Sequence, residues 1–422
     1  MFKKIAFTFG IRIIIAVLNL AIVVLLSRYT GAAGKGEASL IVTTIAMILL
    51  FCNMVGGSSL VYFVPRYNIL QLFMLSNAWS LIVCVASYLI FICSSIVPAN
   101  VVVPVVLLSL INSFLSTNLT ILLGKEKINT HNLLLLLQAL ANIILLWLMV
   151  KGLDQSNVNA YIISLYAAMG LCLLISCILI LPLIKADQQK KQDGLLPRLA
   201  SYGFYNQAGH VMKFMSFRCT YYMLSGYSGD VVLGIFSNGV SLVESVFLIS
   251  NSIATVLYPK VANSTDLQYS QKLTLQLTKF SILLCFAALM PLVLLPSGFF
   301  VWLFGSEFAG VHHVILVLAP GILCYNIALV MGHYFSGIGK YKVNTLANFI
   351  GLVTTLILAA FYLPDFGITQ VGVISTLSYV TTTAFIIFYF VKEAKIKAWE
   401  LVPAPADFKW LWAETWSLFK RE

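Results

Sequence analysis

Long apolar runs follow one another along almost the whole chain, separated by short polar segments. A helix that crosses a bilayer needs about 20 consecutive apolar residues, and the 422-residue chain contains such runs from near its first residue to about residue 391. Charged residues make up 10% of the chain, whereas a soluble domain carries about 25%. A water-soluble fold cannot cover this much apolar surface, so the sequence predicts an all-α integral membrane protein.

The polar breaks between the runs predict twelve membrane-spanning helices. We expect them near residues 8–28, 37–63, 72–96, 101–123, 131–150, 158–184, 201–224, 232–256, 274–296, 314–335, 342–363 and 368–391.

The loops carry their positive charge on one side of the predicted membrane. With the termini on that side, its loops and the tail hold nineteen Lys and Arg residues, whereas the opposite loops hold only Arg28, Lys35 and Lys151. Because basic loops stay cytoplasmic, we expect both termini in the cytoplasm. This asymmetry accounts for most of the net charge of +11, and nucleic-acid binding is not needed to explain it.

Three short motifs occur twice in the chain. "GKEKINT" at 124–130 resembles "GKYKVNT" at 339–345, "LSRYTG" at 26–31 resembles "LSGYSG" at 224–229, and "VPRY" at 64–67 resembles "YPKV" at 258–261. Parallel repeats of this kind are a common transporter architecture. We therefore predict a six-helix bundle over 1–184, a cytoplasmic linker over 185–200, a second six-helix bundle over 201–391 and a cytoplasmic amphipathic aromatic tail over 392–422, with a cavity between the two bundles.

Charged side chains inside the predicted spans are the strongest sign of a site. Each costs about 2.5–3.5 kcal/mol at the centre of a membrane helix. Arg12, His210, Lys213 and Arg218 bring positive or titratable groups, and Glu244 is the one acid near mid-membrane. Depth alone pairs Lys213 with Glu244 and leaves Arg218 without an acid nearby in sequence. The surplus positive charge favours an anionic ligand such as pyrophosphate, since Arg binds phosphate oxygens through two hydrogen bonds and Lys acts as a point charge.

Polar side chains also recur at helical spacing within several spans, where they do not face lipid. The residues expected to line a cavity are Asn19, Asn112, Gln138, Asn142, Asn206, Ser241 and Asn251. Structural interpretations stay open for all of these groups. In these interpretations, Arg12 extends its side chain to the lipid headgroups. A Lys213–Glu244 pair, or His210, then serves helix packing, and the Ser and Asn stripes hold neighbouring helices together.

Longer stretches resemble a known family. "VLYPKVAN" at 256–263, "GIFSNGVSLVES" at 234–245 and "PGILCYNIALVMGHYFSGIGKYKVNTLAN" at 320–348 are similar to bacterial polysaccharide-biosynthesis flippases of the multidrug/oligosaccharidyl-lipid/polysaccharide (MOP) exporter superfamily. The resemblance extends over about residues 1–395. Arg218 and Glu244 fall where such flippases often carry an Arg and a Glu, and Thr220 replaces an Asp that is frequent there.

The resemblance implies a function. Members of this family carry undecaprenyl-pyrophosphate-linked oligosaccharide units across the bacterial inner membrane by alternating access, for O-antigen, capsule or exopolysaccharide assembly. Arg12, His210, Lys213 and Arg218 are then expected to bind the anionic head, with Glu244 in gating or coupling. The resemblance also implies polysaccharide polymerase and chain-length proteins as partners. No cofactor or metal is expected, and coupling to a sodium or proton gradient is compatible with this sequence.

Two other functions remain open at this point. A cation-exporting drug antiporter of the same superfamily would need acids in its cavity, and this chain offers one such acid against three bases. A membrane glycosyltransferase or polymerase would need carboxylates or a His on a sizeable outer loop. The longest such loop, 297–313, offers only Glu307, His312 and His313. A transporter is therefore predicted rather than an enzyme.

Overall fold

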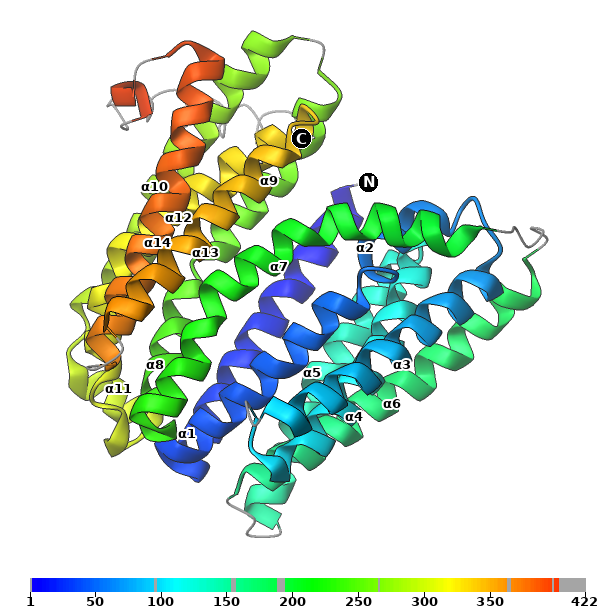
Figure 1. Ribbon diagram of the computed structural model, residues 1–422, viewed down its shortest axis with the longest axis horizontal. Helices are drawn as coiled ribbons and strands as arrows, with labels where there is room; N and C mark the ends of the chain where they lie inside the picture. Colours follow the sequence, from blue (N-terminus) through cyan, green and yellow to red (C-terminus); the bar gives the residue numbers. More distant parts are fainter. Residues whose placement is uncertain are drawn as a thin grey trace. The chain divides into compact units, whose positions relative to one another are not determined.

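The computed structural model describes residues 2–94, 97–152, 157–187, 194–264, 266–362, 366–396 and 398–401, and this part of the chain is helical without any strand. Its elements are α1 (Phe2–Cys52), α2 (Gly57–Phe63), α3 (Ile69–Ser94), α4 (Ala99–Gly124), α5 (Ile128–Gly152), α6 (Val158–Lys185), α7 (Leu195–Ser228), α8 (Asp230–Glu244), α9 (Phe247–Ala262), α10 (Leu267–Leu294), α11 (Ser297–Phe304), α12 (Val311–Gly337), α13 (Tyr341–Tyr362) and α14 (Ile368–Ala394), with 3₁₀ turns η1 (Ser306–Phe308) and η3 (Ala398–Leu401) (Figure 1). The predicted linker positions 188–193 and the tail from residue 402 lie outside the described residues.

The surfaces of the helices confirm a multi-pass membrane protein. Leu174, Ile178 and Leu181 recur at helical spacing along α6 and are each more than half exposed, whereas Ser176 on the same helix is fully buried. Apolar outside and polar inside is the arrangement expected of a helix in lipid. Within the described residues, ten helices are long and apolar enough to cross a membrane.

Each of the twelve predicted spans has a helical counterpart, but the match to those ten helices is not one to one. α1 contains the first predicted span and most of the second, which ends in α2, and α7 is too polar to be counted among the ten. At Gly31, inside α1, the backbone is not helical (φ 68°, ψ −174°), and the chain turns back there (Figure 1). The loop expected between spans one and two is thus a single glycine. Twelve crossings stay a prediction.

The chain folds into two compact units, each assembled from segments that are not contiguous in sequence. Unit 1 comprises Met1–Phe214, Ser228–Gly234 and Leu303–Glu307, and unit 2 comprises Met215–Tyr227, Ile235–Trp302 and Phe308–Glu422. The core of unit 1 contains Ile41, Val105 and Leu146, and that of unit 2 contains Phe236, Tyr334 and Phe390. α7 and α8 each contribute residues to both units. The division into two six-helix halves with a boundary at 185–200 stays a prediction.

Unit 1 contains a helix that breaks partway along the second predicted span. α1 ends at Cys52 and α2 begins at Gly57. Side chains of neighbouring helices bind the backbone carbonyls at this break: Trp79 Nε1 donates to Phe51 O (3.0 Å), Ser76 Oγ to Val55 O (3.2 Å) and Gln207 Nε2 to Asn53 O (3.4 Å). Irregular backbone at membrane depth requires such partners, so α3 and α7 stabilise the break.

The turn at Gly31 is held by a segment distant in sequence but within the same unit. The Glu307 carboxylate accepts a hydrogen bond from the Ala32 backbone N–H (Oε2–N 2.6 Å), and Arg28 Nε donates to Leu303 O (2.9 Å). Ala32 begins the second limb of α1, where backbone N–H groups lack helical partners and a carboxylate is favourable. Glu307 therefore caps this limb.

Glu307→Ala is expected to lower the free energy of unfolding by about 1 kcal/mol, as other lost N-caps do. Glu307→Gln should recover part of this loss, because the amide oxygen can still accept the Ala32 N–H. Thermal unfolding of the purified protein in detergent measures both effects. Equal stability of Glu307→Ala and the parent would contradict the capping role.

The two copies of the repeated loop motif adopt the same conformation, but residues that are equivalent in the structure are shifted by two positions from the sequence alignment of the motif. After α4, Lys127 N–H binds Leu122 O and Glu126 N–H binds Leu123 O; after α12, Lys340 N–H binds Phe335 O and Gly339 N–H binds Ser336 O. Both are Schellman caps with a left-handed residue, Glu126 (φ 59°) or Gly339 (φ 77°). Identical residues of the two motifs are 215 positions apart in the sequence, whereas equivalent residues of the two caps are 213 positions apart.

A second pair of contacts confirms this spacing. His131 Nδ1 lies 3.1 Å from Leu119 O, and Asn344 Nδ2 donates to Gly332 O at 2.7 Å. In both cases a side chain in the first turns of one helix binds a carbonyl twelve residues earlier in the preceding helix. His131 is therefore the structural counterpart of Asn344, although the motif aligns Asn129 with Asn344.

The left-handed positions give a reciprocal prediction. Glu126→Gly should raise the free energy of unfolding by about 0.5–1 kcal/mol and Gly339→Glu should lower it by about 1 kcal/mol, because only glycine adopts this backbone without a Cβ penalty. Thermal unfolding in detergent measures both variants side by side. A stabilising Gly339→Glu would contradict the assignment of the cap.

Candidate functional site

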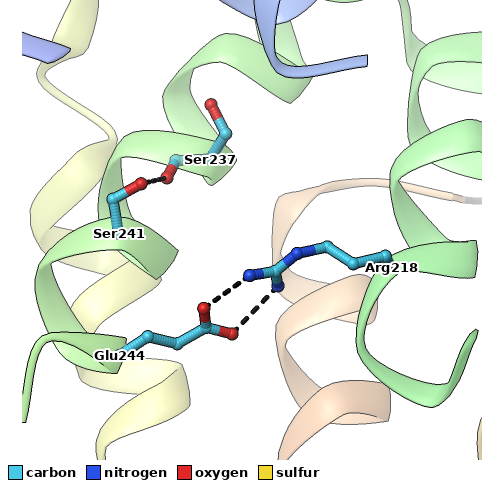
Figure 2. A network of polar contacts seen from close by, with 4 residues as sticks. All are labelled: Arg218, Ser237, Ser241 and Glu244. Atoms are coloured by element: carbon cyan, nitrogen blue, oxygen red, sulfur yellow. Dashed lines mark hydrogen bonds and ion pairs between the residues drawn. The ribbon is translucent and has the colours of Figure 1, made fainter. Parts of the chain in front are cut away.

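The candidate site is an ion pair inside unit 2, between α7 and α8. Arg218 Nη1 donates to Glu244 Oε1 at 2.9 Å, and Arg218 Nη2 donates to Glu244 Oε2 at 2.5 Å (Figure 2). The two side chains are 22% and 17% exposed. The guanidinium and the carboxylate thus satisfy each other through two parallel bonds, which is the strong geometry for this pair of groups.

The backbone places Glu244 at an unfavourable end of its helix. Glu244 is the last residue of α8, and α9 begins at Phe247. Between them Ser245 N–H binds Leu242 O and Val246 N–H binds Val243 O, each at 3.3 Å, so the chain passes through tight 3₁₀-type turns. A negative charge at a helix C-terminus opposes the helix dipole. Arg218 therefore supplies the compensation that α8 itself cannot.

An aromatic cluster surrounds the pair within unit 2. The Arg218 guanidinium carbon lies 5.0 Å from the centre of the Tyr221 ring, within the range of a cation–π contact. Phe217, beside Arg218 in sequence, packs on Tyr379 (4.6 Å between ring centres) and Tyr325 (5.0 Å). Tyr221, Tyr325 and Tyr379 are each less than 5% exposed. The cluster gives the pair apolar walls, where electrostatic interactions are stronger than in water.

The polar stripe of α8 continues from the pair. Ser241 lies one turn before Glu244 and donates its hydroxyl to Ser237 O at 2.7 Å (Figure 2). Ser241 is exposed and Ser237 is buried. Asn251, further along on α9, is exposed as well. Ser241 and Asn251 are thus exposed, and their role at a cavity stays a prediction, whereas Arg218 and Glu244 contact each other directly.

The pairing corrects the sequence-based prediction that Arg218 has no acid partner and that Glu244 matches Lys213. Lys213 and Arg218 are five residues apart, which places them about 140° apart around the helix. Matching by depth ignores this rotation, and it is the Arg218 side of α7 that contacts α8. Arg218 consequently carries no surplus positive charge while Glu244 is bound.

The remaining predicted residues lie in unit 1. Arg12, Asn19 and His210 are exposed, and Asn112, Gln138 and Lys213 are partly buried. Asn142 is buried and accepts a hydrogen bond from Ser164 Oγ at 2.9 Å, which makes it a contact between α5 and α6. The side chain of Asn206 lies outside the described residues. The role of these residues in binding stays a prediction.

The aromatic cluster is the part of the site that sequence reasoning missed. Tyr221 lies next to the polar face predicted for α7, and the spacing of Phe217 and Tyr221 places two rings around Arg218 on one helix. Tyr325 and Tyr379 lie on α12 and α14, more than a hundred residues away. In the sequence, the only indication of these two residues is a tyrosine within an apolar run. Such a tyrosine does not indicate which charged residue it will lie near in the fold.

Comparison with known proteins gives distant sequence relatives. The chain is 24% identical over 172 residues to a capsular polysaccharide biosynthesis protein of Staphylococcus aureus, covering 40% of this chain and 43% of that protein. It is 21% identical over 168 residues to a Haloferax volcanii protein described as a probable low-salt glycan biosynthesis flippase, covering 39% of this chain and 36% of that one. The matches thus span less than half of either relative. No protein-family model matches the chain.

Solved structures match over nearly the full length. The inward-closed lipid II flippase MurJ aligns with a TM-score of 0.71 at 15% identity, covering 92% of this chain and 90% of MurJ. An inward-facing multidrug transporter of the MOP superfamily aligns with a TM-score of 0.69 at 12% identity, covering 90% of this chain and 98% of the transporter. This chain has the MOP transporter fold.

The MOP fold agrees with the predicted fold class and with the family resemblance of the motifs. The matches include proteins described as a probable glycan flippase, a lipid II flippase and a multidrug transporter. The prediction of a transporter rather than an enzyme agrees with how these relatives are described. Because both flippases and drug transporters have this fold, the class of substrate must be inferred from the residues of the site.

Proposed function

We propose that this protein is a flippase that carries a lipid-linked oligosaccharide, joined to its undecaprenyl chain by pyrophosphate, from the cytoplasmic to the outer leaflet of the bacterial inner membrane. The relatives involved in capsule and glycan biosynthesis support the glycan, and the flippase with the same fold supports the lipid carrier. Transport by alternating access would serve the assembly of O-antigen, capsule or exopolysaccharide. The polymerase and chain-length proteins that use this product are proposed partners.

The observation that carries the proposal is the half-buried guanidinium of Arg218. An arginine within a membrane-spanning bundle is costly and is expected only where it has a function or a partner. Its two outer nitrogens are arranged side by side, as their bonds to both oxygens of Glu244 demonstrate. The same arrangement fits two oxygens of a phosphate.

Lys213 on the same helix is proposed as a second positive charge for the headgroup, with Arg12 and His210 as further contacts. Asn and Ser side chains of the polar stripes would bind sugar hydroxyls. The excess of Lys and Arg in loops on one side supports cytoplasmic termini. A sodium or proton gradient is a suitable energy source for the cycle.

A chase of labelled lipid-linked glycan in cells that lack the protein tests this function. We expect the glycan to accumulate on the cytoplasmic leaflet, and the wild-type protein to relieve the accumulation. Arg218→Lys should relieve it in part, because one charge remains without the two-point geometry. Normal glycan export in the deficient cells, together with altered sensitivity to cationic drugs, would contradict the proposal and favour the antiporter.

A further inference from the structure

Glu244 occupies the two terminal nitrogens of Arg218, through which a phosphate can also be bound. Nη1 and Nη2 each donate one N–H to one carboxylate oxygen, so the end of the guanidinium that these two nitrogens form is in use. A phosphate binds a guanidinium through the same two parallel bonds. Glu244 and an anionic ligand therefore cannot hold this fork at the same time.

The surroundings allow Glu244 to leave while Arg218 stays in place. The ring of Tyr221 lies beside the guanidinium on the same helix and contacts it independently of Glu244. Glu244 ends α8, next to the 3₁₀ turns at Ser245 and Val246. Short 3₁₀ stretches inside a longer helical segment often mark positions that can move.

The environment also sets which ligands can displace Glu244. The walls formed by Tyr221, Tyr325 and Tyr379 are buried and apolar in their rings. Removing a carboxylate from a guanidinium in such surroundings leaves a charge uncompensated, and this costs far more than a neutral hydroxyl can restore. A second anion with paired oxygens can restore it. The pair therefore discriminates by charge before any sugar is recognised.

We propose that Glu244 is a built-in competitor of the substrate: it holds Arg218 in the empty carrier, yields to the pyrophosphate of the headgroup, and returns to Arg218 to expel the headgroup at release. This inference rests on the proposed function and explains how the binding site returns to its empty state after the headgroup is released. The competitor lowers the affinity for pyrophosphate and speeds its release. Removing it should thus tighten binding and slow turnover.

Binding of inorganic pyrophosphate to the purified full-length protein in detergent, measured by isothermal titration calorimetry, tests the inference. Glu244→Gln is nearly the same size as the native side chain and should bind pyrophosphate about tenfold more tightly, since the neutral amide competes less well for a charged donor. Arg218→Ala should lose binding. N-acetylglucosamine serves as a neutral probe and should not discriminate between the variants.

Two further variants keep the test decisive. Glu393→Gln is the matched control, because Glu393, near the end of α14, forms an exposed 2.6 Å ion pair with Lys340 in the loop between α12 and α13. The pyrophosphate affinity of this variant should equal that of the wild type. Glu244→Asp keeps the charge but shortens the side chain, so its affinity should fall between those of the wild type and Glu244→Gln. Glu244→Asp also serves if Glu244→Gln does not fold.

The outcomes separate this inference from the proposed function. Wild-type or weaker pyrophosphate affinity in both Glu244 variants, with binding lost in Arg218→Ala, would overturn the competitor role and leave the flippase proposal standing. Tetraphenylphosphonium, a cationic probe, gives the opposite pattern if the site binds cations, with tighter binding in Arg218→Ala and loss in Glu244→Gln. That pattern, without pyrophosphate binding, would overturn both proposals.

Discussion

Arg218→Ala is expected to reduce glycan export about 30-fold or more, because loss of one member of a buried, hydrogen-bonded charge pair typically costs about 2–5 kcal/mol and tenfold corresponds to about 1.4 kcal/mol. The variant should also lose stability, since Glu244 is left without its partner at the C-terminal end of α8. A fully buried pair broken in this way costs about 3–5 kcal/mol. With the side chains 22% and 17% exposed, we expect the lower end of that range. Export of labelled glycan and thermal unfolding in detergent measure the two effects.

A double variant separates the two effects. Arg218→Ala with Glu244→Ala leaves no unpaired charge, so the free energy of unfolding should return to near the wild-type value, while export stays lost because the anion-binding group is absent. Recovery of export in the double variant would show that Arg218 serves only to neutralise Glu244, and would contradict a role in substrate binding.

Gly36→Ala and Gly234→Ala are expected to prevent formation of a stable unit 1. A Cβ at Gly36 would lie 1.9 Å from Asp230 O, and a Cβ at Gly234 would lie 1.9 Å from Ala32 O. Both obstacles are backbone atoms, so no side chain can move aside. α1 and α8 approach here through small residues four positions apart, Ala32 with Gly36, as at other close helix crossings in membranes. Forcing the helices apart should cost at least the 1–3 kcal/mol typical of overpacking.

Gly170→Ala is the matched control for this pair of variants. Gly170 also lies within a helix, α6, and a Cβ there would meet no atom within 4 Å. Because alanine favours a helix over glycine by about 1 kcal/mol, this variant should be as stable as the parent or more so. Monodispersity on size exclusion and thermal unfolding compare the three proteins. Wild-type behaviour of Gly36→Ala would contradict the close contact of α1 and α8.

The sequence predicted an all-α membrane fold, because apolar runs of membrane-spanning length obey a simple physical rule in lipid. It did not predict the details inside the spans. The apolar run over 232–256 gives no sign that α8 ends at Glu244 and α9 begins at Phe247, since a break depends on which neighbours bind the released backbone groups. The repeated motif identified two equivalent loops, but in the structure the counterpart of Gly339 is Glu126 rather than Gly124.

The candidate site was predicted in its residues and not in their pairing. Charges within spans identified Arg218 and Glu244 because such residues are rare in lipid. Their contact depends on the rotation of α7 about its axis, which is set by packing against other helices. The tyrosines of α12 and α14 that surround the pair come from distant segments, and only the folded chain brings them to Arg218.

The most direct test of the central claim is flipping of a defined substrate by the purified protein in liposomes. A short undecaprenyl-pyrophosphate-linked oligosaccharide is placed in one leaflet, and its arrival in the other is followed by cleavage with a glycosidase that cannot cross the membrane. We expect the wild-type protein to accelerate this arrival and Arg218→Ala not to do so. Equal acceleration by the two proteins, or none by the wild type in the orientation that carries substrate outward, would contradict it.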